Sequence, residues 1–181
     1  MQQGPLGRRA LSEELEIKDG IARGLLERLA EQNIIRVREN GVELTFTGKK
    51  KLQSFLDKLS IKKVMVLETS DIAPGPSAAA AHVRKAYRSG MSGVQQRDEA
   101  IKAGADGAIT MAVKNGELRI PPDNAKISEL APSENKRLGQ LLNLSDDDLV
   151  IIGFGQSPRR ALAGALAAVL SLEHSREEDS S

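Results

Sequence analysis

The chain has 181 residues, of which 40% are hydrophobic and 28% are charged, a balance typical of a folded globular protein and not of a disordered one. The absence of cysteine excludes disulfides and thiolate metal sites, so we expect a cytoplasmic protein in a reducing compartment. No apolar run is long enough for a transmembrane helix, and residues 1–9 lack the apolar core of a signal peptide, so we expect no membrane contact.

Positive charge is concentrated in the N-terminal third of the chain. Residues 1–63 hold 13 of the 26 Lys and Arg residues but only 9 of the 25 Asp and Glu residues. This excess favours a polyanionic partner for the first part of the chain. Aromatic residues make up only 2% of the chain, which disfavours an RNA module that stacks bases on aromatic side chains.

Five elements are predicted in the first sixty residues: a short helix over Arg9–Leu15, a helix from Asp19 to about Gln32, strands over Ile34–Arg38 and Val42–Phe46, and a helix over Gly48–Leu59. Asn40-Gly41 is a strong turn signal and predicts that the two strands form a hairpin.

Apolar spacing and capping residues support both longer helices. We expect Asp19 and Thr47 to cap them. The expected buried stripes are Ile21, Leu25, Leu26 and Leu29 on the first helix, and Leu52, Phe55, Leu56 and Leu59 on the second.

The order helix, turn, helix, two-stranded wing, helix predicts a winged helix-turn-helix over residues 1–60. Winged helices usually have one more helix before the segment that here contains Gly4-Pro5-Leu6-Gly7. Because the chain starts at that point, we expect either that its true start lies further upstream or that something else covers the exposed apolar face.

The second part, residues 61–173, predicts a small mixed α/β domain of four or five strands, so that the whole chain is of the α+β class. The expected strands are Val64–Leu67, Gly107–Val113, Leu118–Ile120 and Leu149–Phe154, and the expected helices are Gln95–Ala103, Ser133–Leu142 and Arg159–Leu172. The alanine-rich segment Ala78–Tyr87 fits a helix or a strand. Residues 174–181 are charged and serine-rich, and we expect them to form a disordered tail.

Three stretches carry a resemblance to a known family: Gly4–Arg8; Arg97–Lys102, continuing through Gly107-Ala108 to Val113-Lys114; and Val150–Ile152 with Ser157-Pro158 and Ala161-Leu162. Through them the chain resembles a set of archaeal proteins with an N-terminal winged helix and a C-terminal domain of unknown function, which are described as transcriptional regulators. The resemblance covers nearly the whole chain. It implies a strand at Ala78–Lys85 and supplies neither catalytic residues nor a ligand.

The candidate DNA contacts are the basic residues of the predicted recognition helix, the wing and the N-terminus: Lys18, Arg23, Arg36, Arg38, Arg8 and Arg9. A winged helix lays its second helix in the major groove and its wing against the backbone, where such side chains contact phosphates or guanine edges. The alternative is a solvated charged surface on a fold that binds other proteins.

A second candidate site is an anion or effector site, formed by Arg97, Asp98, Gly153, Gly155, Ser157 and Arg159. Gly153–Pro158 joins a strand to a helix, and exposed N–H groups at such a junction bind anions. The segment lacks the glycine spacing of nucleotide-binding loops, so a tight turn explains it as well. Asp98 lies near the start of a predicted helix, where a carboxylate stabilises the helix dipole, so no ligand is needed to explain it.

These patterns together predict a DNA-binding transcriptional regulator that forms a homodimer and whose C-terminal domain senses a small-molecule effector, dimerises, or does both. We expect no cofactor and no metal, because the two histidines have no partner at metal-ligand spacing. We also expect no catalysis, because no nucleophile motif occurs. Two alternatives remain open: an adaptor whose winged helix binds only protein, and a small-molecule enzyme with an appended winged helix.

Overall fold

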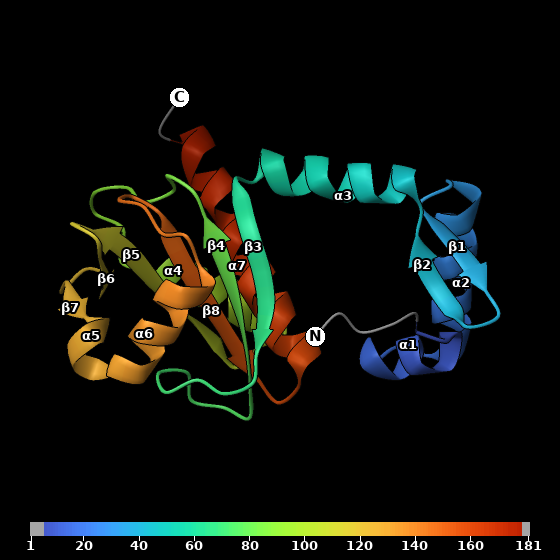
Figure 1. Ribbon diagram of the computed structural model, residues 1–181, viewed down its shortest axis with the longest axis horizontal. Helices are drawn as coiled ribbons and strands as arrows, with labels where there is room; N and C mark the ends of the chain where they lie inside the picture. The colour runs from blue at the N-terminus through green and yellow to red at the C-terminus, as the bar shows by residue number, and fades with distance from the viewer. Residues whose placement is uncertain (1–5, 179–181) are drawn as a thin grey trace. The chain divides into compact units, whose positions relative to one another are not determined.

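The computed structural model describes residues 6–178, with side chains described through residue 173, and divides the chain into two compact units. The smaller unit extends to Leu56 and the larger begins at Asp57, close to the boundary predicted at residue 60. The fold is of the mixed α+β class, and both of the sheets found in the described residues are antiparallel (Figure 1).

The smaller unit contains the elements predicted for it, in the predicted order: α1 (Arg8–Glu14), α2 (Asp19–Glu31), β1 (Ile35–Arg38), β2 (Gly41–Leu44) and α3 (Phe46–Lys58). Strands β1 and β2 form a hairpin in which Arg38 lies opposite Gly41. An isolated bridge between Leu6 and Val42 attaches the segment before α1 to this hairpin.

Four local predictions for this unit need correction. The N-cap residue of α2 is Lys18, not Asp19, which is the first residue of the helix. The turn of the hairpin is at Glu39-Asn40, and Gly41 follows it with a φ of 132° that favours glycine. Helix α3 begins at Phe46 and is capped by Thr45, not Thr47, because the N–H of Gly48 donates to the Thr45 hydroxyl at 2.9 Å.

The predicted apolar stripes are only partly buried. On α2, Ala22 and Leu26 are buried but Ile21 is 57% exposed, because the packed face is rotated by one residue from the predicted stripe. On α3, Leu52 and Phe55 are exposed, and Gly48 is the only residue buried in the helix, against the backbone of Ile34. Helix α3 therefore leaves most of its apolar face in solvent.

The larger unit is built on a six-stranded sheet with the order β3-β4-β8-β5-β6-β7. Its strands are β3 (Ile61–Leu67), β4 (Ser77–Val83), β5 (Gly107–Lys114), β6 (Glu117–Ile120), β7 (Ala125–Lys126) and β8 (Leu149–Gly155). The alanine-rich segment forms β4, as the resemblance implied. The sheet has one strand more than the maximum predicted, because β7 has only two residues and no apolar pattern to reveal it.

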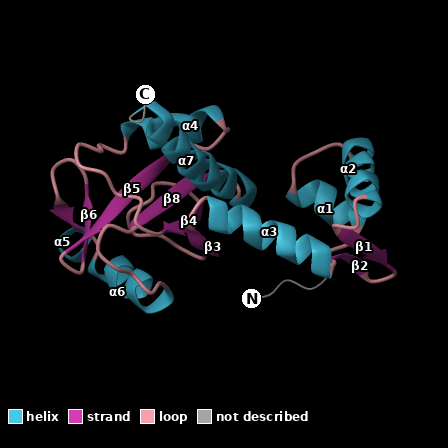
Figure 2. Ribbon diagram, turned by 90° about the horizontal axis from the view of Figure 1, so that it is seen from above, coloured by secondary structure: helices cyan, strands magenta, loops and turns pink. Residues whose placement is uncertain are grey.

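Helices cover both faces of this sheet. Helices α4 (Val94–Lys102) and α7 (Pro158–Glu178) lie on one face, and α5 (Ile127–Leu130) and α6 (Pro132–Leu141) on the other (Figure 2). Strands β4 and β5, which α4 connects, both pair antiparallel with β8 between them, which makes a split β-α-β unit. The main core lies under α5 and α6, around Met111, Leu138 and Ile152.

Helix α7 extends to Glu178, beyond the end predicted at Leu172. The segment after Leu172 contains neither glycine nor proline, so nothing in its sequence stops the helix. The first five residues of the predicted disordered tail, 174–178, belong to this helix, and its last part, residues 179–181, lies outside the described residues.

Candidate nucleic-acid interface

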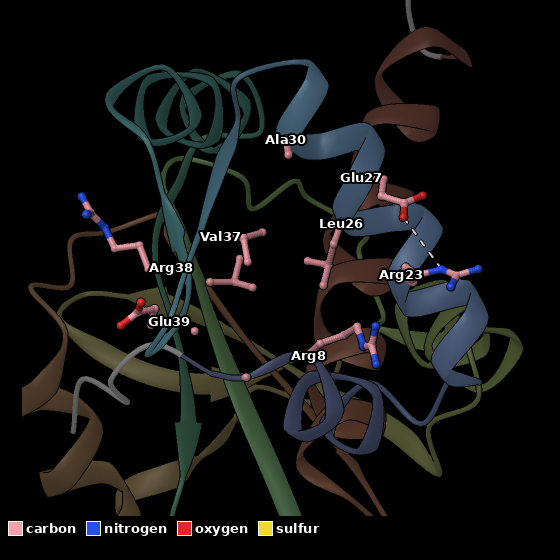
Figure 3. A pocket seen from close by; sticks show the side chains of 11 residues that line it. Arg8, Arg23, Leu26, Glu27, Ala30, Val37, Arg38 and Glu39 are labelled. Atoms are coloured by element: carbon pink, nitrogen blue, oxygen red, sulfur yellow. Dashed lines mark ion pairs between the residues drawn. The ribbon is translucent and has the colours of Figure 1, made fainter.

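A groove of about 330 Å³ lies between α2 and the β1–β2 hairpin. Figure 3 shows that α2 forms one wall and the hairpin the other, with the start of α1 below. The groove is lined by Gly7, Arg8, Arg23, Leu26, Glu27, Ala30, Val37, Arg38, Glu39, Gly41 and Val42. It therefore brings together the start of α1, one side of α2 and the tip of the hairpin.

The groove has an apolar floor and a charged rim. Leu26 and Val37 point toward each other across it, whereas Arg38 points away from α2 (Figure 3). Strand alternation explains this, because Val37 and its neighbours Arg36 and Arg38 project from opposite faces of β1. Val37 is 60% exposed, so the floor remains open to solvent.

Four of the six predicted DNA contacts are paired with acids on the surface of this unit. Nε of each arginine approaches a carboxylate oxygen: Arg8 with Asp19 at 3.2 Å, Arg9 with Glu13 at 3.2 Å, Arg23 with Glu27 at 3.8 Å, and Arg38 with Glu43. The hydrogen bond from Arg38 lowers the pKa of the Glu43 carboxyl. Such exposed pairs contribute little to stability, so a phosphate can compete for each arginine at low cost.

The other two predicted contacts, Lys18 and Arg36, form no direct ion pair among the residues that the structure describes, although the charge of Arg36 helps to lower the pKa of the Glu43 carboxyl. Lys18 is the N-cap residue of α2, and Arg36 lies on β1 opposite Glu43. Both are exposed and available to an anion.

Helix α3 carries most of the excess positive charge of the smaller unit. Helix α2 and the hairpin each contain two arginines, balanced by three and two acids respectively, whereas α3 contains Lys49, Lys50, Lys51 and Lys58 against Asp57. Nζ of Lys50 lies 4.7 Å from the centre of the Phe46 ring. A count of charge within each helix was the signal that could have identified this surface.

The second candidate site is occupied largely by the protein itself. A Cβ atom at Gly153 would lie 2.3 Å from the carbonyl oxygen of Ala161 and 2.4 Å from the nitrogen of Ala165, so the glycine lets α7 pack directly on β8. A Cβ atom at Gly155 would lie 3.2 Å from the Cβ atom of Arg160, which is also on α7. Ser157 caps α7, because its hydroxyl accepts from the N–H of Arg160 at 3.3 Å.

The other members of that candidate site lie on different elements. Arg97 is on α4 and donates to the carboxylate of the adjacent Asp98 at 2.9 Å, while Arg159 is in the first turn of α7. Helix α4 begins at Val94, so Asp98 lies past its first turn and not near its start as predicted. Close packing and capping account for the glycines and Ser157 without a ligand, and an anion site at this junction remains a prediction.

Sequence reasoning missed a buried pair of titratable groups, His82 and Asp148. Nε2 of His82 lies 2.8 Å from a carboxylate oxygen of Asp148, and both side chains are at most 3% exposed. Burial raises the pKa of Asp148, but hydrogen bonds from His82 and from the N–H groups of Lys85 and Ser145 outweigh it and lower the pKa overall. No spacing rule predicts a pair that is 66 positions apart in the chain.

Within residues 6–178, no group of three or more potential ligands is arranged to hold a metal ion. None of the helices in that range combines the length and hydropathy needed to span a bilayer.

Comparison with known proteins identifies relatives of both units. Residues 75–172 match the domain of unknown function DUF4443, and residues 1–50 match the PH0730-like N-terminal domain. The structure of the hypothetical protein PH0730 from Pyrococcus horikoshii OT3 is similar, with a TM-score of 0.77 and 31% sequence identity over 96% of this chain and 87% of that chain. No curated protein matches the chain. The chain belongs to the DUF4443 family.

Proposed function

We propose that the smaller unit is a winged helix-turn-helix and that the chain is a transcriptional regulator that binds duplex DNA as a homodimer. The observation that carries the proposal is the arrangement around the groove, where the start of α1, the side of α2 and the tip of the hairpin lie together. In a winged helix, the second helix of the helix-turn-helix enters the major groove while the wing contacts the flanking backbone.

The order of elements supports the same assignment. Helices α1 and α2 are joined by a short turn, and the antiparallel hairpin follows directly. The bridge from Leu6 to Val42 adds a third, minimal strand contact to the hairpin, which is compatible with a wing.

The basic residues of the smaller unit suit contacts with the DNA backbone whose strength depends on the salt concentration. Lys18 and Arg36 are exposed and form no direct ion pair, and Arg8, Arg23 and Arg38 can exchange their exposed carboxylate partners for phosphate. Each phosphate neutralised releases condensed counterions, so affinity for any duplex falls steeply as salt rises. The lysines of α3 extend the positive surface available to the backbone.

In this proposal the larger unit serves as the dimerisation domain, the sensor of a small-molecule effector, or both. Its dense core suits a rigid scaffold, and regulation then requires an effector that binds the DNA-competent and DNA-incompetent states with different affinity.

A second candidate function, a protein-interaction adaptor, is favoured by the apolar surface of the smaller unit. Ile21, Val37, Leu44, Phe46, Leu52 and Phe55 are all at least 40% exposed. Exposed apolar patches often mark sites that bind other proteins.

Fluorescence anisotropy with duplex DNA separates these functions. The probe is the upstream region of the gene itself, compared with a scrambled duplex at several salt concentrations. A DNA binder is expected to prefer its own upstream region, and the double variant R36A/R38A is expected to weaken binding to both duplexes and to flatten the salt dependence by about two ion equivalents.

The matched control is R84A/K136A, which removes two exposed charges from the larger unit and is expected to leave affinity unchanged. Absence of binding at low salt by folded protein would reject the regulator and favour the adaptor. Equal losses in the two double variants would mean that net charge alone, and not the hairpin, controls binding.

A further inference from the structure

Helix α7 is apolar on every side over most of its length. Residues 161–172 contain no charged side chain, and the one polar side chain among them, Ser171, is buried. The neighbouring helices α4 and α6, by contrast, carry exposed charges such as Lys102 and Lys136. A helix on the surface of a soluble protein normally turns a polar face to water, and one that is apolar all round is normally buried all round.

Only one side of α7 is buried within the chain. That side packs on β8 and β4 and against α4. The other side carries Leu162, Leu166 and Leu170, each four residues from the next, so that they form one continuous stripe. Leu170 is 42% exposed, and the other two leucines are partly exposed. The flanking residues Ala163 and Ala167 are small and also partly exposed, so the outer face of α7 is apolar across its width.

The sheet adds apolar surface beside this helix. Met65 and Leu67 of β3 belong to the core on the opposite face of the sheet, so Val64 and Val66 project from the face on which α7 lies. Val66 is 53% exposed. Contiguous apolar surface of this kind marks sites of association in soluble proteins.

We infer that the outer face of α7 is a homodimer interface, in which the helices of two copies pack antiparallel about a two-fold axis at Leu166. The stripe is symmetric about this residue. Leu162 then lies opposite Leu170 of the second copy, and Arg159 lies opposite Glu173, each pairing occurring twice. Arg159 and Glu173 are three residues before Leu162 and three residues after Leu170, which places both on the same side of the helix as the leucines. The occupant is a second copy because the face is complementary to itself in shape and charge.

Other arrangements of two α7 helices lack this match. A parallel pair places the two Arg159 residues beside each other and the two Glu173 residues beside each other, which is repulsive. Shifting the antiparallel pair by four residues in either direction leaves Leu162 or Leu170 opposite a residue that is not leucine. The register centred on Leu166 pairs all three leucines with leucines and joins the two opposite charges.

The length of the stripe suits a stable helix pair. The fourteen residue steps from Arg159 to Glu173 span roughly 21 Å at about 1.5 Å per residue. Two helices inclined by about 20° remain in contact over such a length, and small flanking residues such as Ala163 let their axes approach to about 8–10 Å. This interface deepens the proposed function, on which its biological meaning rests. It uses no residue of the smaller unit, so the groove and the hairpin keep all the residues proposed to contact DNA.

Substitutions on α7 test the interface without DNA. Sedimentation velocity of the full chain over a range of concentrations gives the dimer Kd. We expect L166E to raise this Kd about a hundredfold or more, because it places two carboxylates against each other at the axis in an apolar contact. The matched control is I101E on α4, where Ile101 is 49% exposed, and it is expected to leave the Kd unchanged. Circular dichroism verifies the fold of every variant.

Charge reversal tests the register. R159E and E173R should each raise the Kd about tenfold, because each turns two attractive pairs into repulsive ones, and the double variant R159E/E173R should restore it. A dimer that is broken by L166E but is not restored in the double variant would overturn the antiparallel register. Rescue by the double variant cannot result from a general loss of folding, so it keeps the test decisive if L166E is unstable.

The natural absence of cysteine permits a third measurement. Facing Cα atoms of two helices packed about 8–10 Å apart lie roughly 5 Å from each other, within the range of a disulfide. Mild oxidation should therefore cross-link L166C into a dimer, whereas I101C should remain monomeric under denaturing conditions. A monomer at all concentrations would overturn the inference, and so would a dimer that is insensitive to L166E. Because mass and cross-linking are measured without DNA, either result leaves DNA binding to be judged separately.

Discussion

The two units of the molecule differ most in how well they bury their apolar residues. Among described residues, the buried hydrophobic side chains of the smaller unit are Ala22, Leu26 and Ile35, while six of its larger apolar residues are exposed. The larger unit buries Met111, Leu138 and most of β8 almost completely. Since a domain of about 60 residues is marginal even when well packed, the smaller unit should be the less stable of the two. Its open surface suits binding, and the larger unit suits a scaffold.

The largest loss of stability is expected when α7 can no longer pack on β8 in the larger unit. We expect G153A to cost more than about 3 kcal/mol, because the added methyl would collide with backbone atoms of α7 that cannot rotate away. Urea unfolding measures the loss. Gly139→Ala is the control: it is exposed on α6 with nothing within 4 Å of its Cβ position, and it should slightly stabilise the helix. Equal stability of the two variants would contradict the close packing.

Truncating one buried leucine in each unit tests the difference in stability between the two units directly. Leu138→Ala should cost about 3 kcal/mol in the larger unit, and Leu26→Ala about 2 kcal/mol in the smaller one. Tyr87 is the only tyrosine and tryptophan is absent, so intrinsic fluorescence reports the larger unit while circular dichroism reports both. We expect L26A to shift only an early transition seen by circular dichroism. A single shared transition, shifted equally by both changes, would mean that the units unfold together.

The larger unit also contains the pH sensitivity that the buried pair predicts. The folded-state pKa of Asp148 lies below its ordinary value of 3.8, so its stabilisation is present above that value and is lost as the pH falls through the folded pKa. Asp148→Asn should cost about 2 kcal/mol near neutral pH, because the partners of the carboxylate lose their acceptor, and should flatten the decline below pH ~4. Asp147→Asn, at an exposed neighbour, should leave the profile unchanged.

Sequence patterns predicted elements best where the local signal and the packing agree. The strands predicted at Gly107–Val113 and Leu118–Ile120 flank the turn signal Asn115-Gly116, and these two residues have the positive φ angles, 52° and 73°, that the turn between β5 and β6 needs. The continuous apolar run Leu149–Phe154 predicted the buried strand β8. Both signals are local and are not altered by the rest of the fold.

Prediction failed where tertiary packing decides. Apolar spacing predicted burial of Ile21, Leu52 and Phe55, but periodicity shows only that a helix has an apolar face and not that anything covers it. For the candidate interface, the sequence singled out six basic residues as DNA contacts, yet it could not show that Arg8 and Arg23 would each meet a carboxylate. Likewise, the role of Gly153 depends on where α7 lies, which is a property of the fold.

The smallest change in stability is expected for Gly24→Ala, in α2 of the smaller unit. Glycine inside a helix costs about 0.5–1 kcal/mol relative to alanine, and one explanation is that it permits close approach of a neighbouring helix. In the structure nothing lies within 4 Å of a Cβ at this position, so the free protein gains no packing from the glycine. G24A should therefore stabilise the smaller unit by about 0.5–1 kcal/mol, measured as a rise in the urea concentration at the midpoint of the early transition.

Gly24 follows Arg23, which lines the groove, so the same variant also tests the proposed function. If DNA approaches α2 closely there, G24A should lose affinity for duplex DNA while gaining stability, an opposition that a purely structural role for the glycine cannot produce. Gly139→Ala, with its comparable gain in helix propensity on the larger unit, should leave DNA affinity unchanged. A destabilised G24A would show instead that a contact at α2 helps to hold the smaller unit together.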